Sequence, residues 1–114
     1  MDVVERFLDR LVAKDWAGLG ETLAADGFRR VGPFGEVAAS RKEYLDLVAG
    51  AVGGLDDYAI DVRRIVRGDG EAVAELGESA VVDGQPTSWG EAMVFDLDGD
   101  VIRGIAVYLM RPTP

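Results

Sequence analysis

The stretch from Asp69 to Tyr108, DGEAVAELGESAVVDGQPTSWGEAMVFDLDGDVIRGIAVY, decides the fold of this 114-residue chain. It opens on an Asp-Gly pair, and the pair recurs at 83–84 and 98–99. Asp-Gly is a strong hairpin-turn signal, because glycine adopts positive φ without strain and aspartate tolerates it better than most residues. The spacing predicts four long strands, 57–67, 71–82, 87–97 and 101–111, joined in order by tight turns into an antiparallel meander.

Alternation within these strands predicts which side chains share a face of the sheet. In the first strand the apolar positions slip across Arg63-Arg64, which predicts a β-bulge. Both faces of the last strand are largely apolar, so both are expected to be covered. One face of the third strand carries Trp89, Glu91, Met93 and Phe95; in the last, Gly104, Ala106 and Tyr108 lie opposite Ile105, Val107 and Leu109. The outer face is expected to hold Val73, Val81, Val94, Ile105 and Val107, and this apolar surface predicts a homodimer through the sheet.

Three helices are predicted before the meander. The first covers residues 3–13 and can be capped by Asp2, and a second short helix can be capped by Asp15. A capping box from Ser40 to Glu43 starts the third helix, which Gly53-Gly54 ends. A short strand, 28–31, lies between the second and third helices. Together these elements predict one α+β domain over residues 1–114.

Composition excludes several classes of function. The chain has 21 acidic and 12 basic residues, a net charge of −9, which repels polyphosphates and makes nucleic acid an unsuitable partner. Cysteine and histidine are absent, so no thiolate chemistry is available, and we expect neither a metal site nor a cofactor. No apolar run is long enough to span a membrane, and the acidic amphipathic N-terminus does not read as a signal peptide, so we expect a cytoplasmic protein.

Five short segments carry a family resemblance. They are KDWAGL at 14–19, LAADGF at 23–28, GPFG at 32–35, VFDLDGDVI at 94–102 and VY at 107–108. In this order the chain resembles the nuclear transport factor 2-like superfamily over nearly its whole length, and within it the SnoaL-like domains, with a likeness to ketosteroid isomerases. The resemblance implies an α+β cone: three N-terminal helices on a strongly curved, mixed, mainly antiparallel sheet, with an apolar pocket open at one end.

The catalytic residues of the resembling enzymes are not matched. Where ketosteroid isomerases carry a tyrosine, an aspartate base and a protonated acid, this chain has Phe7, Gly32 and a position near Met93. The SnoaL-like cyclases use histidine and aspartate in the pocket, and this chain has no histidine. No catalytic residue is therefore transferred from either group.

Glu91 and Glu78 are the candidate catalytic residues. Glu91 shares a face with large apolar side chains, so an inward carboxyl there would be partly desolvated and its pKa raised, as for a tuned general base. The alternative is an ion pair or a solvated position at the end of the strand. The family pattern turns Glu78, Glu91 and Arg30 inward together, where an arginine between two carboxylates serves either a structural network or a ligand. Glu75, one residue out of phase, is expected on the outer face.

Large side chains from the helices and the sheet are candidates for lining the pocket. Trp89 and Tyr108 suit this role best, because each has a polar tip on an apolar body, and Tyr108 could donate to a ligand carbonyl. The alternative is that most of these side chains fill the core. The candidate ligand-binding residues are Arg30, Tyr108, Trp89, Met93, Tyr44, Trp16 and Phe7.

Two functions follow from this sequence. The first is a SnoaL-like pocket protein that binds an apolar small molecule with carbonyl or hydroxyl groups. Its chemistry, if it is an enzyme, would be cofactor-free proton transfer next to a carbonyl, as in an isomerase or cyclase, with Glu91 or Glu78 as base and Tyr108 or Arg30 stabilising the enolate. The second is a non-catalytic dimeric binding or protein-interaction module.

Overall fold

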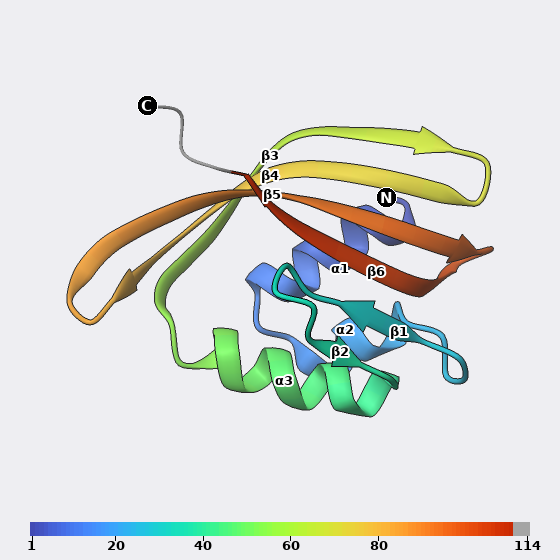
Figure 1. Cartoon of the computed structure of the whole chain (residues 1–114), viewed down its shortest axis with the longest axis horizontal. Helices are drawn as coiled ribbons and strands as arrows, with labels where there is room; N and C mark the ends of the chain where they lie inside the picture. The colour runs from blue at the N-terminus through green and yellow to red at the C-terminus, as the bar shows by residue number, and fades with distance from the viewer. Residues whose placement is uncertain (111–114) are drawn as a thin grey trace.

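The computed structural model describes residues 1–110, in which three helices pack on a six-stranded sheet (Figure 1). The helices are α1 (Val3–Val12), α2 (Trp16–Glu21) and α3 (Arg41–Gly53). The strands are β1 (Arg29–Val31), β2 (Val37–Ala38), β3 (Asp56–Gly68), β4 (Glu71–Val82), β5 (Gln85–Asp98) and β6 (Val101–Met110). No helix among the described residues is long and apolar enough to cross a membrane.

The sheet order is β2-β1-β6-β5-β4-β3, so the predicted meander from β3 to β6 is confirmed. Its three tight turns carry the Asp-Gly pairs, and Gly70, Gly84 and Gly99 all have positive φ. The short strand β1 pairs in parallel with β6, which makes the sheet mixed. Because neighbouring strands run in opposite directions, the β4–β5 turn lies at the opposite end of the sheet from the other two hairpin turns (Figure 1).

The slip in the apolar pattern of β3 is a β-bulge, as predicted. The register of β3 against β4 shifts between Val62 and Arg64. Beyond the bulge Arg64 pairs with Glu75, and their side chains form an ion pair at 2.7 Å on the outer face. Glu75 therefore lies on the face that alternation assigned to it.

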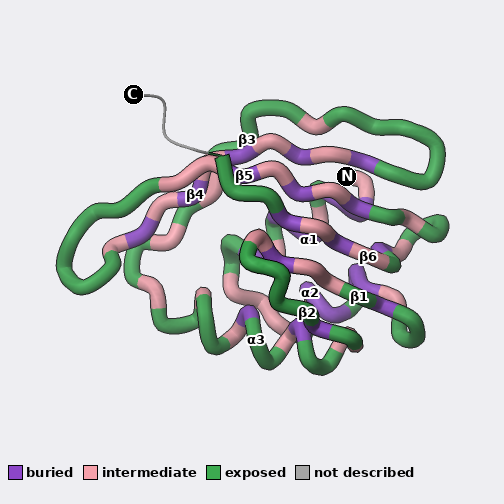
Figure 2. The backbone as a smooth tube through the Cα atoms, in the orientation of Figure 1, coloured by how far each residue is buried: buried purple, intermediate pink, exposed green. Residues whose placement is uncertain are grey.

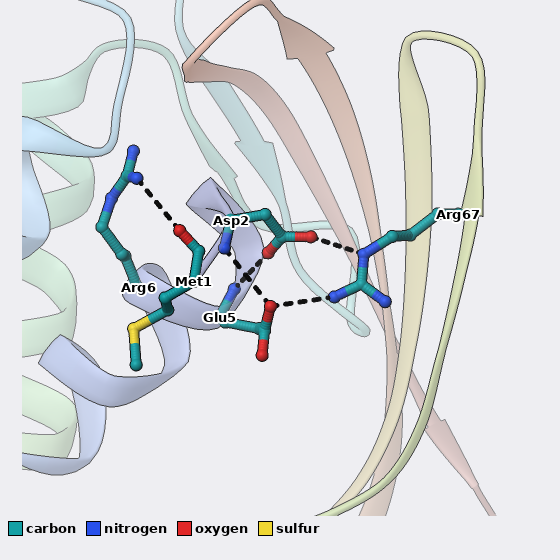
Figure 3. Close-up of polar contacts among 5 residues, drawn as sticks. All are labelled: Met1, Asp2, Glu5, Arg6 and Arg67. Atoms are coloured by element: carbon teal, nitrogen blue, oxygen red, sulfur yellow. Dashed lines mark hydrogen bonds and ion pairs between the residues drawn. The ribbon is translucent and has the colours of Figure 1, made fainter.

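A complete capping box begins α1 and is tied to the sheet. The Asp2 carboxylate accepts from the Glu5 amide at 2.9 Å, and Glu5 accepts from the Asp2 amide at 3.3 Å. Arg67, at the end of β3, donates to both carboxylates, with a distance of 3.2 Å to Glu5 (Figure 3). Arg6 donates to the Met1 carbonyl at 3.4 Å. One guanidinium thus fastens the start of α1 to the β3–β4 hairpin.

The other two helices start at the predicted caps, with one difference. The Asp15 carboxylate accepts from the Gly18 amide at 2.9 Å, and the Ser40 hydroxyl accepts from the Glu43 amide at 3.1 Å. The Glu43 carboxylate reaches the Ala39 amide, at 2.7 Å, instead of that of Ser40. The reciprocal half of the predicted capping box is therefore wrong by one residue, because the chain entering α3 presents Ala39 to this side chain.

The core lies between the helices and one face of the sheet, which we call the inner face. Buried positions alternate with more exposed ones along β4, β5 and β6 (Figure 2). Phe7 of α1 is fully buried and meets Phe95 of β5 edge to face, with ring centroids 5.5 Å apart. The largest fully buried side chains are Phe7, Phe28, Phe95, Leu19, Leu23, Leu76, Ile102 and Val4.

The prediction for the faces of β6 is wrong. Ile105 and Val107 are buried on the inner face, where they pair with Phe95 and Met93 of β5. Tyr108 instead lies on the outer face and is 59% exposed. Because both sets of side chains in this strand are apolar, alternation alone could not tell which one turns inward; the register with β5 decides it.

Candidate functional site

Two glutamates of the inner face form the centre of the candidate site. Glu78 of β4 pairs with Trp89 of β5, and Leu76 pairs with Glu91, so the two carboxyls are diagonal neighbours on adjacent strands. They are 7% and 5% exposed, which is unusual for an acidic residue. The inward orientation expected for both is therefore what the structure has.

A tyrosine anchors one of the two carboxyls. The Tyr58 hydroxyl donates to Oε2 of Glu78 at 3.0 Å, from the neighbouring strand β3. Burial raises the pKa of the Tyr58 hydroxyl, and the negative charge of Glu78 raises it further, so the phenol stays protonated. Tyr58 was not among the site residues predicted from the sequence. The sequence showed only that Tyr58 belongs to the apolar alternation of β3. Its contact with Glu78 could not be predicted, because that contact depends on the register of β3 against β4.

Glu91 is held in its protonated form. Burial raises the pKa of Glu91 to about 9, and hydrogen bonding to Glu78 and the negative charge of Glu78 act in the same direction. The positive charge of Arg30 and a hydrogen bond from Trp89 oppose the shift. Two carboxyls this close together do not both ionise readily, so at neutral pH the pair holds one proton.

Tyr44 of α3 lies over the same region of the sheet. Its side chain is buried, with its ring centroid 5.5 Å from that of Phe28 and 6.4 Å from that of Phe7. Burial raises the pKa of the Tyr44 hydroxyl; the charge of Arg30 lowers it, and those of Glu78 and Glu91 raise it. Tyr44 thus brings a second neutral hydroxyl within electrostatic reach of the two glutamates.

Arg30 does not lie between the two carboxylates as predicted. Within the described chain its ion pair is with Glu36, at 3.4 Å, across the β1–β2 turn. Its side chain is only 15% exposed, and its Nε is buried without a hydrogen-bond partner. Gly32 makes the pair possible, because a Cβ there would collide with the Glu36 carboxylate and lie 2.7 Å from Arg30 Nη1. The β1–β2 turn therefore places the Arg30 guanidinium against Glu36 and not between the two glutamates. Its positive charge still acts to lower the pKa of Glu91.

The other candidate residues fall into three groups. Phe7 and Met93 are buried in the core. Trp16 packs against the core from α2, and Trp89 is half-buried on the inner face beside Glu78. Tyr108 pairs with Ala92 on the outer face, so its predicted role as an inward hydrogen-bond donor does not fit its position.

The outer face of the sheet carries a groove of about 730 Å³. Gly77 and Gly90 face each other across β4 and β5 and leave its floor without side chains. A Cβ on Gly77 would lie 3.3 Å from Arg63 Nη2, and one on Gly90 would lie 2.9 Å from Met110 Cε, so these two side chains border the groove. It is lined by Ala59, Ile60, Asp61, Arg63, Gly77, Glu78, Ser79, Ser88, Trp89, Gly90, Leu109 and Met110.

Three solved structures illustrate the likeness of this fold to known proteins. A protein of Catenulispora acidiphila with a ketosteroid isomerase-like fold, in complex with trimethylamine, is 17% identical (TM-score 0.82; 93% of this chain and 83% of that one). An LEH-like epoxide hydrolase of M. tuberculosis is also 17% identical (TM-score 0.81; 95% and 80%). A SnoaL-like polyketide cyclase of Shewanella denitrificans is 7% identical (TM-score 0.85; 95% and 88%). At these identities the likeness shows the fold.

Among curated proteins, none matches this chain. The sequence model of the SnoaL-like domain, however, matches residues 4–106, which include α2, α3, all but the first residue of α1 and most of the sheet. Together with the cone of helices and curved sheet, this match identifies the chain as a member of the SnoaL-like domain family.

Proposed function

We propose that this SnoaL-like domain binds an apolar small molecule bearing a carbonyl group and moves a proton on the carbon next to that carbonyl. One observation carries the proposal: two inward carboxyls of the same face are more than nine-tenths buried, and one of them is held protonated. A protonated carboxyl beside a second buried carboxyl provides a proton donor next to a candidate base, which is the arrangement that general acid–base chemistry requires.

The two glutamates take different roles in this reaction. The negatively charged Glu78 removes the proton from carbon, and the electron pair moves onto the carbonyl oxygen as an enolate. The protonated Glu91 donates a hydrogen bond to that oxygen, and a hydrogen bond from a donor already in place stabilises the developing charge. Glu78 then returns its proton to a carbon of the ligand. Both carboxyls are back in their starting protonation states, and the reaction needs no cofactor.

Hydrogen–deuterium exchange tests this reaction without knowledge of the natural ligand. Cyclic ketones, steroids and aromatic polyketides are incubated with the protein in D₂O, and NMR measures loss of the proton next to the carbonyl. We expect saturable exchange, lowered about 10²- to 10⁴-fold by Glu78→Gln. Glu75→Gln is the matched control, since Glu75 lies on the outer face of the same strand. Exchange by Glu78→Gln at the rate of the unsubstituted protein would contradict the assignment of the base.

The second candidate function is a non-catalytic dimeric module that acts through the outer face. The groove over Gly77 and Gly90 supports it, together with the partly exposed Val73, Val81 and Val94 on the same face. A second copy of the chain is the proposed occupant, because the same face exposes Tyr108 and Met110 of β6, and a partner would cover this apolar surface.

Sedimentation distinguishes the proposed dimer from a monomer. We expect a dimer at micromolar concentration and a monomer for Gly77→Glu, which would place a charge in the groove of a chain whose net charge is already −9. The far-ultraviolet circular dichroism spectrum is expected to stay unchanged, because the space above Gly77 is bounded by the flexible end of Arg63. A monomeric unsubstituted protein would remove this candidate.

A further inference from the structure

The protonation of the glutamate pair depends on which carboxyl is better supplied with hydrogen-bond donors. The Tyr58 hydroxyl donates to Oε2 of Glu78 at 3.0 Å, and Trp89 lies opposite Glu78 on β5. A donor favours the charged form of the carboxyl that it contacts, so Tyr58 favours the charged form of Glu78. The other ionisable groups that face the pair are Arg30 of β1 and Tyr44 of α3.

The strand pairing holds the Tyr58 donor in place. Its hydroxyl is fixed by its strand: Ile60, two residues along β3, pairs directly with Glu78, so Tyr58 reaches Glu78 from the same face. The phenol is half-buried and has no competing partner among the described hydrogen bonds. A hydrogen bond from a neutral donor to a carboxylate is stronger than one to a protonated acid.

We infer that Tyr58 is a positioning residue: its hydroxyl keeps the negative charge on Glu78 and thereby leaves the shared proton on Glu91. The inference rests on the proton transfer proposed above, in which Glu78 is the base and Glu91 the acid. Tyr58 also occupies Oε2 of Glu78, so the remaining oxygen, Oε1, is the one available to take a proton from a ligand.

Carboxyl carbon NMR tests where the proton lies, and it needs no substrate. The glutamate signals are titrated in the unsubstituted protein, in Tyr58→Phe and in Trp89→Phe, with assignments from Glu78→Gln and Glu91→Gln. In the unsubstituted protein the step at the higher midpoint is expected in the Glu91 signal. Loss of the Tyr58 donor is expected to give Glu78 a share of that proton, so that the Glu78 signal takes a measurable part of this step and the Glu91 signal loses the same part. Trp89→Phe is the matched control, since it leaves the Tyr58 hydroxyl on Glu78 and should keep the step on Glu91.

A second measurement uses the unsubstituted protein, so it does not depend on the folding of a variant. The Cζ signal of Tyr58 reports the protonation of its hydrogen-bond partner. It is expected to shift at the lower midpoint of the pair, where Glu78 takes up a proton, and to stay constant at the higher midpoint, where Glu91 loses its proton. A shift at the higher midpoint would place the proton on Glu78 and overturn the inference, as would a Glu78 signal in Tyr58→Phe that takes no part of the step at the higher midpoint.

The exchange assay separates the failure of this inference from the failure of the proposed function. If the unsubstituted protein exchanges ketone protons, Tyr58→Phe should lower kcat, because the form with Glu78 charged and Glu91 protonated becomes less populated, with KM little changed. Exchange by Tyr58→Phe with the original kcat would refute the role of Tyr58 and leave the function standing. If no ketone exchanges at all, the proposed function fails, and the titration still decides the position of the proton.

Discussion

Stability is expected to fall as the pH rises through neutrality, and Glu91 is the cause. The pKa of Glu91 is raised from its ordinary 4.5 to about 9 in the folded chain. Between these values the folded protein holds a proton that the unfolded chain releases. Stability from such a group is complete below the unfolded pKa and is lost as the pH rises towards the folded pKa.

The size of the effect follows from proton linkage. One proton bound only by the folded state changes the free energy of unfolding by about 1.4 kcal/mol for each pH unit. From pH 6 to pH 8 the loss is therefore about 3 kcal/mol, a large part of the 5–15 kcal/mol that stabilises a typical domain. Little else titrates in this range, because the chain has neither histidine nor cysteine.

Urea denaturation at a series of pH values between 5.5 and 8.5, followed by the fluorescence of Trp16 and Trp89, measures this dependence. The difference between the unsubstituted protein and Glu91→Gln isolates the contribution of Glu91, because a glutamine needs no proton to be neutral. The variant should show a nearly flat profile, and Glu75→Gln, on the outer face, should keep the original slope. A flat profile for the unsubstituted protein, or the same slope in Glu91→Gln, would refute the buried, protonated state of Glu91.

Three further predictions concern the framework of the site. Phe7→Ala should lower the free energy of unfolding in urea by about 3–5 kcal/mol, since this fully buried ring contacts Tyr44 and Phe95; a loss below 1 kcal/mol would show that the core relaxes around the gap. Lys14→Met should lower the free energy of unfolding in urea by about 1–2 kcal/mol, because the ammonium donates to the carbonyl of Gly53, the last residue of α3, and to that of Leu55 just after it. Arg67→Met should lower the melting temperature more at low salt than at 1 M NaCl, because its ion pairs are exposed; an equal loss at both would assign the effect to packing.

Local signals in the sequence determined the elements of the fold. The Asp-Gly pairs place the three hairpin turns, because the turn geometry needs positive φ at particular positions. Asp2, Asp15 and Ser40 place the starts of the helices, because each can satisfy free backbone amides a few residues ahead. The bulge after Val62 was readable from the break in alternation. All of these depend on residues close together in the chain.

Only the tertiary structure decided what the elements place side by side. Alternation predicted that Glu91 lies among apolar neighbours. It could not predict that Glu91 lies beside Glu78, or that Tyr58 donates to Glu78, because these contacts depend on the registers of three strands. The inward face of β6, and with it the exposure of Tyr108, depended on the pairing of that strand with β5. Arg30 was diverted to Glu36 by a tight turn that leaves room only for glycine at position 32. A slip of one residue in a strand reverses every side chain in it, and long-range pairing, which sets the register, has no local signal in the sequence.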